Sequence, residues 1–76
     1  SEDLHRIRPS VWIGKYGCTP EIIEEIRSQL AVRKIIKVRW LRNADVDPEE
    51  LARLSKSRIL QRRGRTVILA LPVREK

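Results

Sequence analysis

Residues 11–21, on which the fold most depends, are Val11-Trp12-Ile13-Gly14-Lys15-Tyr16-Gly17-Cys18-Thr19-Pro20-Glu21. The apolar run before the loop predicts a short buried strand. Thr19 and Pro20 predict a helix start, because a capping hydroxyl is followed by proline at the first helical position. A G-x-x-G loop between them lets another backbone approach closely, since neither glycine has a Cβ atom. Free amide groups and the helix dipole make this junction suited to an anion.

The rest of the chain alternates between strand-like and helix-like patterns. The predicted strands are residues 10–13, 35–41, 57–62 and 66–71, and the predicted helices are residues 20–32 and 48–55. In the second helix Leu51 and Leu54 are the expected buried contacts, Asp47 is the expected cap, and Glu50 completes a capping box. Gly64 can supply the positive φ of a hairpin turn between the last two strands.

This order predicts a two-layer α/β fold, β-α-β-α-β-β, with a four-stranded mixed sheet. The first two strands should be parallel because a crossover helix joins them, and the last two antiparallel because their turn is short. Both helices can cover one face of the sheet. Lys37 and Arg39 should then point to the bare face. We expect one domain over residues 1–76, with residues 1–8 and 73–76 loose.

The charge distribution favours a polyanionic partner. Residues 33–76 hold thirteen basic residues against five acids, whereas residues 1–32 hold four against five, and the net charge is +7. Three basic residues, Arg62, Arg63 and Arg65, crowd the hairpin turn, where their mutual repulsion would be relieved by a polyanion. The alternative is a generally basic, solvated surface. Together with the loop, the charge favours nucleic acid.

Several other classes of protein are disfavoured. One His and one Cys without a third partner do not make a nucleophile–base pair, and no cluster has metal-ligand spacing, so we expect no enzyme, metal or cofactor. No apolar run approaches the length of a membrane span. The single Cys18 cannot form an internal disulfide, which fits a reducing cytoplasm. That thiol could be a small buried filler, or a reactive group with a pKa lowered by the adjacent helix.

The residues resemble the CRM domain, named for chloroplast RNA splicing and ribosome maturation, which includes the YhbY-type proteins. Three segments carry the resemblance: residues 11–21 with the helix that follows them, Lys34-Ile35-Ile36-Lys37-Val38, and Gly64-Arg65-Thr66 before an apolar strand. It extends over roughly residues 7–72. Family members often begin with a longer basic helix. Only about nine residues precede the first strand here, so we expect the sheet face that such a helix would cover to be more open.

The resemblance implies an RNA-binding module related in fold to the C-terminal domain of translation initiation factor three. YhbY-type members associate with precursors of the large ribosomal subunit, and plant organellar members act in intron splicing. The implied partner is therefore ribosomal or other structured RNA. The protein is expected to be a monomer that could join pre-ribosomal particles. In the family the G-x-x-G loop contacts RNA with nearby basic residues. The rival hypothesis is a protein-interaction module that docks an acidic partner.

The expected RNA-binding residues come from the loop, the helix start, the second strand, the hairpin and the segment before the first strand. They are Gly14, Lys15, Tyr16, Gly17, Thr19, Arg8, Lys37, Arg39, Arg62, Arg63 and Arg65, with Arg6 grouped beside Arg8. Simpler roles stay open for the loop residues. Gly14 and Gly17 could serve only the turn, Lys15 could be a solvated lysine, and Tyr16 could have a packing role instead of stacking on a base. Trp12 and Trp40 could be core or sheet-face residues, and one on the bare face would offer stacking.

Overall fold

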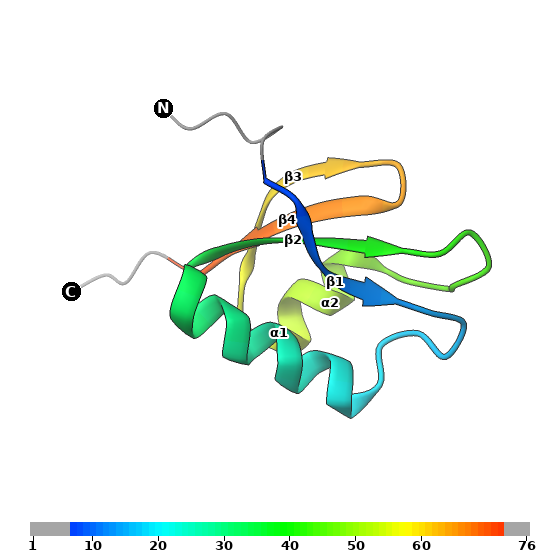
Figure 1. Ribbon diagram of the computed structural model, residues 1–76, viewed down its shortest axis with the longest axis horizontal. Coiled ribbons are helices and arrows are strands. Elements are labelled where there is room, and N and C mark those ends of the chain that lie inside the picture. The colour runs from blue at the N-terminus through cyan, green and yellow to red at the C-terminus, as the bar shows by residue number, and fades with distance from the viewer. Residues whose placement is uncertain (1–6, 73–76) are drawn as a thin grey trace.

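The computed structural model describes residues 7–72 and has the predicted element order (Figure 1). The elements are β1 (Pro9–Ile13), α1 (Pro20–Arg33), β2 (Ile35–Trp40), α2 (Pro48–Ser55), β3 (Arg58–Arg63) and β4 (Thr66–Ala70). The predicted bounds hold to within one residue. Arg63 belongs to β3 and not to the turn, while Leu41 and Leu71 lie just beyond their strands.

The sheet is mixed, with strand order β1-β2-β4-β3. The pair β1–β2 is parallel, whereas β2–β4 and β4–β3 are antiparallel, which confirms the predicted fold class. These directions bring three connections to one end of the sheet: the loop after β1, the loop after β2, and the β3–β4 turn. All three lie together at the right of Figure 1.

Helix α1 begins at the predicted cap. The Thr19 Oγ1 accepts a hydrogen bond from the Ile22 N–H at 3.3 Å, and Pro20 occupies the first helical position. The helix ends at Arg33 and is capped by Lys34, which has a left-handed φ of 71° and whose N–H donates to the Leu30 carbonyl. Ile26 and Leu30 are fully buried, so this face of α1 anchors the helix to the sheet.

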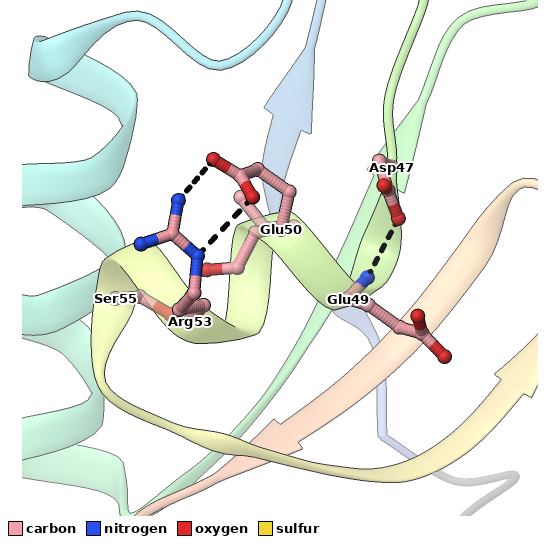
Figure 2. Close-up of polar contacts among 6 residues, drawn as sticks. Asp47, Glu49, Glu50, Arg53 and Ser55 are labelled. Carbon is pink, nitrogen blue, oxygen red and sulfur yellow. Dashed lines mark hydrogen bonds and ion pairs between the residues drawn. The ribbon is translucent and has the colours of Figure 1, made fainter.

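Helix α2 is short, and its polar contacts differ in part from those predicted (Figure 2). The Asp47 carboxylate caps it by accepting from the Glu49 N–H at 3.1 Å. Glu50 does not complete a capping box; it accepts instead from the Arg53 guanidinium one turn later. Glu50 and Arg53 are three residues apart, so their side chains are neighbours on the helix surface and form a salt bridge. This salt bridge holds the Glu50 carboxylate away from the cap.

The core fills the space between the helices and one face of the sheet. The sheet contributes Val11, Ile13, Ile36, Val38, Trp40, Val67 and Leu69, and the helices contribute Ile26, Leu30, Leu51 and Ala52. The prediction that Leu54 is buried was wrong: its side chain is 38% exposed, while Leu51 is fully buried. Ala52 and Ser55 are also buried; Ser55 lies four residues after Leu51 and three after Ala52, so it neighbours both on the packed side of α2.

The two tryptophans lie on opposite faces of the sheet. Trp40 is buried in the core, whereas Trp12 is 55% exposed on the face that the helices leave uncovered. The predicted looseness of residues 1–6 and 73–76, and the position of Arg6, fall outside the described residues. No helix in the described part of the chain is long and apolar enough to cross a membrane.

Candidate nucleic-acid interface

The loop between β1 and α1 is a tight turn closed by its two glycines. The Gly17 N–H donates to the Gly14 carbonyl at 3.0 Å, which leaves Lys15 and Tyr16 at the tip. Both tip side chains are exposed, and Tyr16 is 81% exposed. A second bond, from the Thr19 N–H to the Gly17 carbonyl at 3.0 Å, leads the chain into α1. The turn therefore presents its tip to solvent beside the positive end of the helix dipole.

The two glycines are under different constraints. Gly17 has a φ of +73°, which side chains rarely adopt, and a Cβ atom there would lie 3.6 Å from the Asp45 carbonyl oxygen. Gly14 has no positive φ, and a Cβ atom there would meet only Leu41 Cδ1, at 4.0 Å. The fold thus requires glycine at 17 but not at 14.

Alanine substitutions should separate these two roles. Gly17→Ala is expected to lower the free energy of unfolding by about 1–2 kcal/mol, the cost of a left-handed alanine. Gly14→Ala should change it by less than about 0.5 kcal/mol, because nothing crowds the added methyl group. Urea denaturation of both variants measures the difference. Equal losses of stability would contradict the described loop geometry.

Charge on the loop is polarised. The Lys15 ammonium lies 5.4 Å from the centre of the Tyr16 ring, so the tip is cationic and aromatic. Beyond the tip, burial raises the pKa of the Cys18 thiol, and the carboxylates of Glu50 and Asp47 raise it further. The thiol is therefore not activated by the helix, and Cys18 is a half-buried packing residue. An anion is therefore attracted to the cation at the tip and repelled by the carboxylates near Cys18.

The loop after β2 and then the β3–β4 turn follow the G-x-x-G loop along one end of the sheet. The Trp40 N–H donates to the Arg65 carbonyl at 3.0 Å, and the Leu41 N–H donates to the Ile13 carbonyl at 3.0 Å. Neighbouring strands lie about 4.8 Å apart, so β1 and β3 are separated by roughly 14 Å. The cationic side chains of Lys15, Arg42 and Arg65 thus share one end of the molecule.

The uncovered face of the sheet carries a second group of basic residues, which we call the open face. Its positions follow from the strand register: Trp12, Arg39, Thr66 and Arg63 form one row, and Lys37, Ile68 and Gln61 form the next. The Arg39 guanidinium lies 5.4 Å from the centre of the Trp12 ring. No acidic residue occurs in any of the four strands. The described acids all lie in the helices or the loop after β2.

A shallow hollow of about 100 Å³ opens on this face. Its lining residues are Lys37, Gln61, Arg63, Thr66 and Ile68. Four of them offer polar or cationic groups over the apolar Ile68, which suits an anionic or hydrogen-bonding group. In the described residues no three His, Cys, Asp or Glu side chains gather as they would around a metal ion.

Comparison with known proteins identifies the family. The CRS1 / YhbY (CRM) domain family matches residues 1–70 of the chain. The chain belongs to this family. The CRM domain described here is 32% identical over 69 residues to the Bacillus subtilis protein named "Probable RNA-binding protein YqeI", covering 86% of this chain and 72% of that protein.

A solved structure has the same fold as this CRM domain. It is the solution structure of SAV1595 from Staphylococcus aureus, which has 32% sequence identity and a TM-score of 0.71. The likeness covers 93% of this chain and 78% of SAV1595.

The CRM domain brings most of the predicted site residues together, with three qualifications. Arg8 precedes β1, so the strand, at about 3.3 Å per residue, separates it from the loop that follows. Arg62 pairs with the buried Val67 and points to the helix side, away from Arg39. The Thr19 hydroxyl is engaged as the helix cap, which leaves it less available to a ligand.

The sequence interpretation missed several residues of this surface. Arg42 shares the end of the sheet with Lys15, a neighbourhood that follows from the parallel pairing of β1 and β2. Gln61 and Thr66 line the hollow on the open face. No sequence signal assigns Gln61 to that face, because an irregularity in β3 between Ile59 and Gln61 shifts the alternation.

Proposed function

We propose that this CRM domain binds RNA through its G-x-x-G loop and the basic residues along the adjacent end of the sheet. The observation that carries the proposal is the exposed Lys15–Tyr16 tip beside the capped N-terminus of α1. The chain belongs to a family in which a relative is named as a probable RNA-binding protein, and this supports RNA as the polyanion that is bound. Phosphate oxygens would accept from the loop amides and from Lys15.

The wider role is also part of this proposal. The family resemblance supports ribosomal RNA or its precursors as the ligand, and ribosome assembly or RNA processing as the process. We propose that the chain works there as a single domain without catalytic groups, as a monomer in the cytoplasm. Arg42, Arg65 and Arg63 would follow the RNA backbone from the loop toward the hairpin, since all three side chains are exposed.

A salt titration tests the proposal. The dissociation constant for a structured ribosomal RNA fragment should rise with salt, and its logarithmic slope should be about 0.7 per contacted phosphate for unpaired strands. Fluorescence anisotropy at several salt concentrations measures that slope. An affinity that does not change with salt, or binding no stronger than to an acidic polypeptide of similar charge density, would contradict RNA as the partner.

A further inference from the structure

The open face has features that the loop-based proposal does not use. Trp12 is a large aromatic side chain with 55% of its surface exposed, although it lies in a β-strand beside a well-packed core. The core does not need it, because its neighbours Val11 and Ile13 are the residues of β1 that pack against the helices. Its exposure leaves a large aromatic surface that is available to a ligand.

The surroundings of Trp12 are those of a nucleobase-stacking site. The Arg39 guanidinium lies over the indole at 5.4 Å, which restrains the ring and leaves the rest of it exposed. Unpaired bases stack on aromatic rings and on guanidinium planes, and both are present here. A base stacked at this position would therefore meet a restrained surface, which reduces the ordering cost of binding.

The hollow next to this pair fits the backbone of the same strand of nucleic acid. It lies across β2, β4 and β3, with Arg63 and Thr66 in the same row as Trp12 and Arg39. Its volume of about 100 Å³ is that of roughly three water molecules, enough for a small anionic group. Lys37 and Arg63 supply charged donors for phosphate oxygens.

The open face and the G-x-x-G loop are continuous. Trp12 lies two residues before Gly14. The next pair along β1 and β2, Ile13 and Trp40, points into the core, so the row of Trp12 and Arg39 is the last on the open face before the loop. A strand of nucleic acid held by the loop would therefore lie next to this row. The absence of acidic residues from the four strands makes the whole path favourable for phosphates.

We propose that the open face binds unpaired RNA, with one base stacked on Trp12 beside Arg39 and a neighbouring phosphate in the hollow between Lys37 and Arg63. This inference rests on the proposed function and adds to it the kind of RNA that is bound: a single-stranded segment leaving the loop, not a continuous duplex. Double-stranded RNA cannot supply such a base, because its bases are stacked on one another and paired.

Two substitutions of Trp12 test the stacking. Trp12→Thr removes the aromatic ring but keeps a residue that favours strands, and it should weaken binding of a short unpaired oligoribonucleotide by about tenfold. Trp12→Phe keeps an aromatic ring and should bind within about threefold of the unaltered protein. Circular dichroism and urea denaturation establish that both variants fold, which is expected since Trp12 lies outside the core.

Tryptophan fluorescence provides the second measurement. The oligoribonucleotide should quench the emission of the unaltered protein, and this quenching should vanish in Trp12→Phe, whose remaining Trp40 is buried. A fully paired duplex of the same length should not quench it. Undiminished binding by Trp12→Thr, or quenching that persists in Trp12→Phe, would overturn the inference.

The outcomes also distinguish other occupants and the parent proposal. Quenching by an acidic peptide but not by RNA would assign the open face to a protein partner. Quenching when the protein alone is concentrated would assign it to a second copy of the chain. Either result would overturn the inference. If the unaltered protein binds RNA and Lys15→Glu weakens it, but Trp12→Thr does not, the open-face inference fails alone. If the unaltered protein binds no RNA, the proposed function fails with it.

Discussion

Replacing Lys15 by glutamate is expected to weaken RNA binding by about 10- to 100-fold. Lys15 stands at the tip of the turn closed by Gly14 and Gly17, and its side chain is exposed. A hydrogen bond to a charged group contributes about 1.5–3 kcal/mol, and the new carboxylate would also repel phosphate. The logarithmic salt slope should fall by about 0.7 for the lost phosphate contact.

Arg33→Glu is the matched control for this experiment. It reverses one exposed charge in the last turn of α1, roughly 20 Å along the helix from the loop. Both variants change the net charge equally, so a general electrostatic effect would weaken both alike. We expect Arg33→Glu to lose less than about threefold in affinity. Equal losses in the two variants would contradict a binding site at the loop.

The second large effect concerns stability. Leu51→Ala is expected to lower the free energy of unfolding by about 2–5 kcal/mol, because Leu51 is fully buried where α2 meets the core. A domain of this size has a thin core and a total stability near the lower end of the usual range of about 5–15 kcal/mol. The variant is therefore expected to be close to unfolded at 37 °C. Urea denaturation at lower temperature measures the loss.

Leu54→Ala on the same helix is the control. Leu54 lies three residues later but is 38% exposed, so its truncation should cost less than about 1 kcal/mol. The two variants remove the same atoms from the same kind of residue. A loss from Leu54→Ala as large as that from Leu51→Ala would show that α2 packs in a different orientation from the one described.

The element order and the fold class were predictable from the sequence because the local signals agree with one another. Thr19-Pro20 and Asp47-Pro48 mark both helix starts, and Gly64, with its φ of +57°, marks the hairpin turn. A crossover helix between two strands forces them to be parallel. These are short-range constraints, which a single sequence contains in full.

The features that were mispredicted or left open depend on tertiary packing. Leu51 and Leu54 both occupy apolar positions of an eight-residue helix, and only the direction from which α1 and the sheet approach decides which one is buried. Trp12 and Trp40 were left open between core and sheet face, and the register of β1 on β2 sets Trp12 opposite Arg39 on the uncovered face. Likewise, Glu50 was expected to complete the cap but found a nearer partner in Arg53.

The loop of the candidate site was predictable from the sequence, but the full set of residues on the open face was not. The loop from Gly14 to Gly17 is contiguous in sequence, so its residues must lie together. The open face is assembled from all four strands, and the order β1-β2-β4-β3 that brings Trp12, Arg39 and Arg63 into one row is a property of the whole sheet. The RNA contacts of these residues stay predictions.

Amide chemical-shift mapping during titration with an oligoribonucleotide tests the central claim most directly. We expect the amide signals of Gly14 to Gly17 and of the first turn of α1 to shift most, with smaller changes along the open face and none at the C-terminal end of α1. If RNA binds while the signals of the loop and the first turn of α1 stay unchanged, the loop is not where the phosphates are held, and the account is wrong.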